Sequence, residues 1–126
     1  MTGMKLSEEK GDGSFRIRGY DAGRIVVNET GYEHSLVLAP EHLDTDWPPQ
    51  RFDDLRREHL DVVLELDPEV ILLGTGGHQR FPGRDLMLCV LERGIGFEVM
   101  DTAAACRTYN ILMAEGRPVA AALLID

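Results

Sequence analysis

Long apolar runs are missing from this sequence of 126 residues, and so is any excess of positive charge. No run approaches the roughly 20 apolar residues that a membrane-spanning helix needs, so insertion into a membrane is not expected. The 22 acidic residues outnumber the 13 lysines and arginines, which gives a formal net charge of -9. Without a basic surface, binding to the phosphates of nucleic acid or to an anionic membrane is disfavoured.

Cysteine is scarce as well, since Cys89 and Cys106 are the only two and form no CxxC pattern. Both lie in apolar, helix-like segments, so we expect free thiols and a reducing cytoplasm. The histidines, cysteines and acids have no zinc-ligand spacing, and neither a metal nor a cofactor is expected. Residues 1–13 lack the apolar core of a signal peptide. They are predicted to form a ragged start, followed by a single domain at 14–126.

The first part of the chain predicts three short strands. Ser14 to Tyr20 alternates between polar and apolar side chains, and residues 24–28 and 33–38 follow it after tight turns. Strands joined by such short connections favour an antiparallel meander. Residues 42–50 are polar and contain two consecutive prolines, which predicts a loop. We expect Trp47 to anchor that loop to the core.

Strands and helices alternate in the rest of the chain. Apolar residues recur at helical spacing from Leu55 to Leu66, and Asp67-Pro68 ends that helix. The elements expected after it are strand 70–73, loop 74–83, helix 85–93, strand 97–100, helix 102–115 and strand 119–125.

These strands form runs of apolar residues that need cover on both faces of a sheet. Right-handed crossovers place helices on one face, which leaves the other face for the meander. We therefore predict an α/β fold with three layers, β/β/α: the meander, the main sheet and the helices.

A glycine-rich loop follows the predicted strand 70–73 and begins Gly74-Thr75-Gly76-Gly77-His78. Loops between a strand and a helix can cradle phosphate with their backbone N–H groups. The G-x-G-x-x-G pattern is incomplete, however, and no Walker lysine follows. The glycines can also serve a tight exit from the strand, so both interpretations remain open.

Polar residues also mark the start of the helix 102–115. Asp101 and Thr102 can cap its first turn, or they can face a ligand at the carboxyl ends of parallel strands. Helical side chains lean toward the N-terminus, so Arg107, with Asn110 one turn later, is expected near that edge. Arg107 can form a salt bridge with Asp101 or Glu98, or it can complete an anion or carboxylate site.

The segments GTGGHQRFP, residues 74–82, and GFEVMDTAAACRTYNILMAEGRPVAAAL, residues 96–123, resemble a small family of single-domain proteins from bacteria, archaea and mitochondria. Its members include a mitochondrial complex I assembly factor and an adipogenesis-associated protein. The resemblance covers about residues 14–125. It implies a β/β/α domain with a Rossmann-like mixed sheet. Most bacterial members of this family have no assigned molecular activity.

Two functions of different classes follow. The resemblance implies a non-enzymatic interaction or assembly protein that has protein partners and lies in the bacterial cytoplasm. The alternative is a small module that binds an anion or a carboxylate, with weak catalysis, through the glycine loop, the Asp101-Thr102 cap and Arg107. No residue is assigned a catalytic role, and Cys106 is expected to be a core residue rather than a nucleophile.

Overall fold

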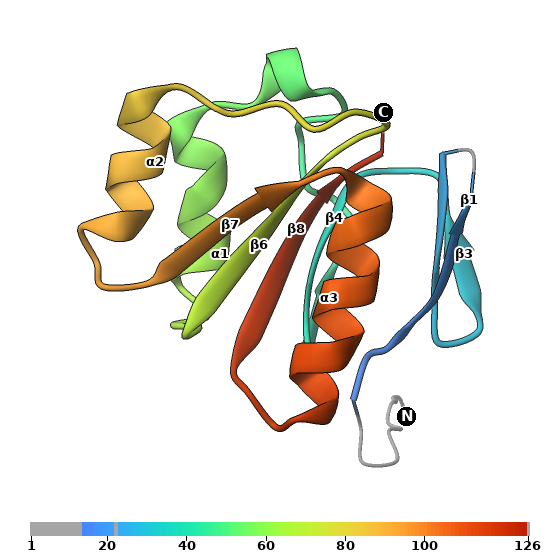
Figure 1. Cartoon of the computed structure of the whole chain (residues 1–126). Helices are drawn as coiled ribbons and strands as arrows, with labels where there is room; N and C mark the ends of the chain where they lie inside the picture. Colours follow the sequence, from blue (N-terminus) through green and yellow to red (C-terminus); the bar gives the residue numbers. More distant parts are fainter. Residues whose placement is uncertain (1–13, 22, 126) are drawn as a thin grey trace.

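The computed structural model describes residues 14–21 and 23–125, so the predicted ragged start at 1–13 lies outside the described residues. The described strands form two sheets (Figure 1). The small sheet has the order β1-β2-β3, with β1 Ile17–Asp21, β2 Arg24–Val27 and β3 Thr30–Tyr32. The main sheet has the order β5-β4-β8-β6-β7, with β4 Leu36–Ala39, β5 His42–Asp44, β6 Val70–Thr75, β7 Gly96–Met100 and β8 Val119–Leu124.

The helices connect the strands of the main sheet. They are α1 Asp61–Leu64, α2 Arg84–Leu91 and α3 Thr102–Ala114, and α1 is preceded by 3₁₀ turns at Phe52–Asp54 and Arg57–Leu60. The main sheet is mixed, because β6 pairs in parallel with both β7 and β8, whereas β4 is antiparallel to β8 and β5. The mixed α/β fold with a separate small sheet is thus confirmed.

The strand β8 lies inside the main sheet, between β4 and β6. Its sequence, VAAALL, is buried along its whole length. An apolar run without alternation is typical of a strand covered on both faces, which is how this segment was interpreted from sequence. The small alanine side chains leave room for the elements that pack above and below the strand.

Two hydrophobic clusters cover the two faces of the main sheet. One face carries α3 together with the small sheet, and its cluster includes Ile25, Leu72 and Tyr109. The other face carries α1 and α2, with Val63 and Val90 among its buried residues. Figure 1 shows the small sheet beside α3, with α1 and α2 at the other side of the molecule. Two helices therefore occupy the predicted face, whereas α3 shares the face of the small sheet.

The predicted third meander strand, 33–38, was wrong in its bounds and in the sheet to which it was assigned. The small sheet ends with β3, and the next strand, β4, belongs to the main sheet, where Leu36, Val37 and Leu38 pair with β8. All three side chains are fully buried. The segment is too apolar for a sheet with one exposed face, so it is paired in the sheet that is covered on both sides.

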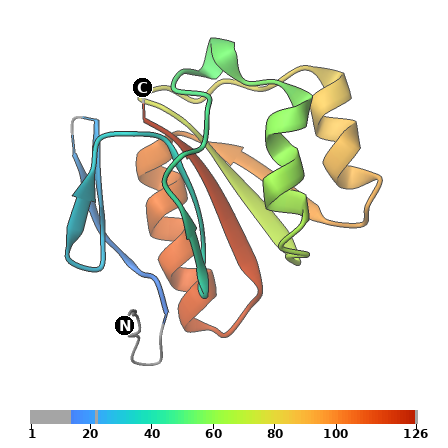
Figure 2. The same cartoon turned by 180° about the vertical axis from the view of Figure 1, so that it is seen from behind.

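The predicted loop 42–50 also begins differently, because its first residues form β5, an edge strand that pairs with β4 (Figure 2). Trp47 is fully buried, and its indole N–H donates to the carbonyl of His59 at 2.9 Å, so its anchoring role is confirmed.

The predicted helix 55–66 is shorter than expected, since only Asp61–Leu64 is α-helical. Asp67 then takes a left-handed backbone conformation, with φ of 52°, and stops it.

Ending the chain at Pro118 should produce insoluble protein, because β4 and β6 would lose their shared neighbour and expose two unpaired edges. The soluble fraction and the circular dichroism of any soluble protein measure this effect. A chain that ends at Ile125 is the control and should remain soluble. A soluble, folded chain without β8 would contradict the central role of this strand.

Candidate functional site

The side chain of Thr102 connects three elements at the carboxyl edge of the main sheet. Its hydroxyl donates to the carbonyl of Leu124 at 2.7 Å and accepts from the N–H of Gly76 at 2.8 Å. The N–H of Thr102 in turn donates to the carbonyl of Gly76 at 2.9 Å. Thr102 is fully buried, so these bonds are shielded from water. They join the end of β6, the end of β8 and the start of α3.

The absence of a side chain at Gly74 allows this close approach. A Cβ atom at this position would lie 2.9 Å from the hydroxyl oxygen of Thr102, 3.0 Å from its Cα and 3.1 Å from a methyl group of Leu123. At Gly77, by contrast, a Cβ atom would meet nothing within 4 Å. Gly74, predicted to begin the loop, belongs instead to β6 and has a packing role, whereas Gly77 is exposed.

The hydroxyl of Thr75 holds the loop that follows β6. It accepts from the N–H of Arg80 at 3.2 Å and lies 2.5 Å from the carbonyl of His78 and 3.2 Å from that of Met100. Its single proton can go to one of these carbonyls at a time. The His78 side chain is exposed. The backbone of the loop is thus tied to β6 and β7, while the imidazole faces solvent.

Asp101 caps α3 as the sequence suggested, because its carboxylate accepts from the N–H of Ala104 at 2.8 Å. Together with the bond from Thr102 to Gly76, this cap occupies two of the N–H groups that a helix N-terminus leaves free. An anion at this point would have to displace these acceptors. The described contacts favour a structural role for the cap.

The remaining two predicted residues face the small sheet. The side chain of Asn110 accepts from the N–H of Ile17 at 3.0 Å and donates to its carbonyl at 2.6 Å, so it pairs with β1 like a strand neighbour. Arg107 is exposed and lines a pocket of about 180 Å³ with Arg18 and Tyr20. Within the described part of the chain it forms no salt bridge with Asp101 or Glu98. Arg107 and Asn110 therefore lie between α3 and β1.

Sequence reasoning missed the second half of the loop. Gln79 donates to the carbonyl of Val99 at 3.0 Å, and Arg80 pairs with Asp53 at 3.0 Å. The guanidinium of Arg80 also lies over the ring of Phe52, 4.5 Å from its centroid. These contacts hold the next residue, Phe81, with 70% of its surface exposed. The sequence signal for this exposed side chain was an aromatic residue, Phe81, beside Pro82 in an otherwise polar loop.

Both cysteines are free thiols, as expected. Burial raises the pKa of the Cys106 thiol to about 12, although the nearby charge of Arg107 opposes this effect. The pKa of Cys89 is also raised, mainly by burial. Such thiols are poor nucleophiles at neutral pH.

Within residues 14–21 and 23–125, no group of three or more histidine, cysteine or acidic residues could hold a metal ion. No helix among these residues has the length and apolar character to cross a lipid bilayer.

The fold and this edge together define a mixed α/β domain whose glycine loop is closed by hydrogen bonds within the protein. The chain belongs to the family of proteins of unknown function DUF498/DUF598, whose model matches residues 17–124. It is 32% identical to the 13 kDa major membrane protein of Francisella tularensis, over 96% of this chain and 99% of that protein. It is 29% identical to bovine NADH dehydrogenase [ubiquinone] 1 alpha subcomplex assembly factor 3, over 98% of this chain and 67% of that protein.

Solved structures of bacterial proteins agree with this fold. A Bordetella parapertussis protein is 43% identical with a TM-score of 0.84, over 90% of this chain and 97% of the other. A Xanthomonas campestris protein is 44% identical with a TM-score of 0.82, over 97% and 92% of the two chains. The Mth938-like domain of a Bordetella pertussis protein is 36% identical with a TM-score of 0.81, over 98% and 93%.

Replacing Gly74 with Ala should destabilise the protein by about 1–3 kcal/mol, because the added methyl group overpacks the contact with Thr102. Chemical denaturation measures the free energy of unfolding. Gly77→Ala is the matched control, since it adds the same methyl group to open space, and it should change stability by less than about 0.5 kcal/mol. Equal effects of the two substitutions would contradict the packing role of Gly74.

Cys106 should resist alkylation by iodoacetamide at pH about 8 in the folded protein and react after unfolding, because its pKa of about 12 leaves very little thiolate. The comparison uses a Cys89→Ser variant, in which mass spectrometry reports on Cys106 alone. Rapid modification of the native protein would show that the thiol is activated rather than suppressed.

Proposed function

We propose that the protein binds other proteins during the assembly of a larger complex, as the name of the bovine relative indicates for that protein. The similarity extends over 98% of this chain, so it includes both sheets and the loop after β6. The partner class we propose is a protein subunit that has not yet joined its complex. The cytoplasm is the proposed location, in keeping with the two free thiols.

The observation that supports this function best is the exposed position of Phe81 on a held loop. Phe81 has 70% of its surface exposed to water. Burying this apolar surface against an apolar surface of a partner would lower the free energy. Aromatic residues are prominent among those that dominate the energy of protein interfaces. Such a residue contributes most when it is already positioned, because little conformational entropy is lost on binding.

The loop around Phe81 provides this positioning through contacts on both sides. On one side, Thr75 and Gln79 bond to backbone groups of the loop and of β7. On the other, Arg80 pairs with Asp53 and lies over Phe52. The salt bridge is exposed and contributes little alone, so the combination of contacts positions the loop. The polar groups of this edge thus support binding through a positioned aromatic side chain.

A small anion-binding module is the second candidate, and one observation favours it. Arg107 and Arg18 line the same pocket of about 180 Å³, and neither has an acidic partner among the described residues. In a protein with a net charge of -9, two unpaired guanidinium groups at one pocket could hold a carboxylate or phosphate. Calorimetric binding of inorganic phosphate that Arg107→Ala abolishes would favour this function over protein binding.

Phe81→Ser should weaken partner binding by about 2 kcal/mol or more, roughly a thirtyfold loss of affinity, with little change in the free energy of unfolding. The tagged full chain is expressed in its own cells, and copurifying proteins are quantified by mass spectrometry. Affinity is then measured with the purified partner.

The matched control is Ile111→Ser. It also removes an exposed apolar side chain, 58% exposed, but from α3 rather than the loop. It should leave partner binding unchanged. If both variants retain every partner, or if both lose them equally, Phe81 does not form the contact that we propose.

A further inference from the structure

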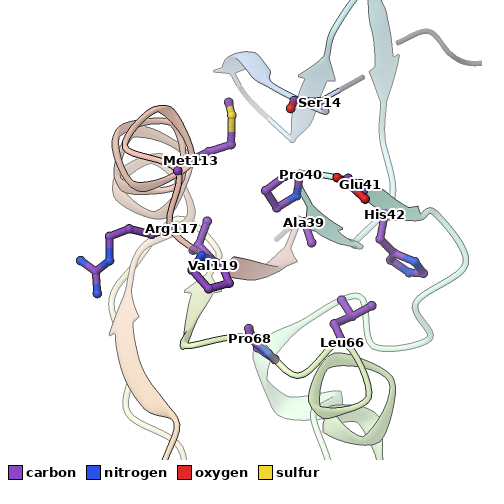
Figure 3. Close-up of a pocket in the computed structure, with 12 residues that line it drawn as sticks. Ser14, Ala39, Pro40, Glu41, His42, Leu66, Pro68, Met113, Arg117 and Val119 are labelled. Carbon is purple, nitrogen blue, oxygen red and sulfur yellow. The ribbon is translucent and has the colours of Figure 1, made fainter. Parts of the chain in front are cut away.

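A cavity of about 600 Å³ opens at the opposite edge of the main sheet, where β6 and β8 begin. Figure 3 shows that four parts of the chain surround it, one of which is Ser14 in the segment before β1. The turn between β4 and β5, the segment before β6 and the end of α3 with the start of β8 each supply a wall. Volumes of about 300–1,000 Å³ are typical of sites for small molecules.

The walls of this cavity, which we call the amino-edge cavity, are mainly apolar. The apolar residues that line it are Ala39, Pro40, Leu66, Pro68, Met113, Pro118 and Val119. Its backbone groups are largely engaged, because the carbonyl of Pro40 accepts from Phe15 at 2.8 Å and that of Pro118 accepts from Glu69 at 2.7 Å. The prolines have no N–H to donate. A ligand would therefore be recognised through apolar contacts and through the few polar side chains at the wall.

One of those side chains, Arg117, is already paired. Its guanidinium lies 3.3 Å from the carboxylate of Glu69, and Figure 3 shows it pointing away from His42 and Leu66. The positive charge nearest the cavity is thus neutralised and turned outward. It does not provide an anchor for an anionic ligand.

The charge left at the rim is negative. Glu41 lies in the turn between β4 and β5, is exposed, and has no hydrogen bond or ion pair with any described residue. The net charge of -9 adds a negative field around the whole molecule. Both effects favour a cation over an anion in this cavity.

A second polar group at the wall also lacks a partner. Within the described residues, the Nε2 atom of His42 is the buried side-chain nitrogen or oxygen without a hydrogen bond. Buried polar atoms almost always have a partner, because an unpaired one loses its hydration without compensation. The atom is covered in this structure. The carboxylate of Glu41, which is exposed at the rim, can accept hydrogen bonds from a donor in the cavity.

We propose that the amino-edge cavity binds a small apolar amine, whose hydrocarbon part contacts Leu66, Met113 and Val119 and whose ammonium group is held by Glu41. The charge of Glu41 disfavours a carboxylate or phosphate of the same size. The ammonium group donates to the carboxylate of Glu41, while the aliphatic part fills the apolar part of the cavity.

The test uses three probes of nearly identical shape: cyclohexylmethylamine, cyclohexylmethanol and cyclohexanecarboxylate. Each is titrated to millimolar concentration into the full chain, and amide NMR shifts give the dissociation constant and the location. We expect saturable shifts at Leu66, Met113 and Val119, with the amine binding at least about fivefold more tightly than the carboxylate. The alcohol should lie between them.

Glu41→Gln should reduce the affinity for the amine about threefold and leave that for the alcohol unchanged, because an exposed ion pair contributes only modestly. The matched control is Glu33→Gln, which removes the same charge from another exposed position. Three results would overturn the proposal: no saturable shift at the cavity with any probe, tighter binding of the carboxylate, or equal effects of the two substitutions. The last result would assign the preference to the overall charge of the protein.

Discussion

The buried hydroxyl of Thr102 is the contact on which the arrangement of the carboxyl edge depends. The hydroxyl donates to the carbonyl of Leu124 at the end of β8 and accepts from the N–H of Gly76 in the turn after β6. Thr102 is also the first residue of α3. Removing it would leave the N–H of Gly76 and the carbonyl of Leu124 without partners in a site closed to water, a cost of about 1–3 kcal/mol for each group. These bonds also fix the start of the loop that carries Phe81, because that loop leaves β6 at the same turn.

The same contact explains why the glycine loop differs from a phosphate-binding loop. In open α/β sheets the carboxyl ends of parallel strands usually leave backbone N–H groups for a ligand. Here Thr102 and Asp101 use those groups within the protein, and Gly74 allows α3 to approach the strand closely. Backbone N–H groups at the usual ligand edge are thus engaged within the protein, whereas the amino edge, where Pro68 and Val119 lead into β6 and β8, has a cavity.

Local patterns predicted much of this fold and part of the site. The apolar run of β8, the Asp101 cap and the anchor at Trp47 each depend on neighbours in sequence or on burial alone, and each was recognised. The placement of α3 depends on distant pairing, since Asn110 and Tyr109 bond to residues of the first strand region, more than ninety positions away. The exposure of Phe81 likewise results from Arg80 and its contacts with a segment far earlier in the chain.

The two edges of the sheet have opposite physical characters, and this separates the two proposed binding events. At the carboxyl edge an aromatic side chain projects from a held loop, which suits a surface that buries it from outside. At the amino edge an apolar cavity with the carboxylate of Glu41 at its rim suits a molecule small enough to enter. Both β6 and β8 are fully buried strands that run from one edge to the other.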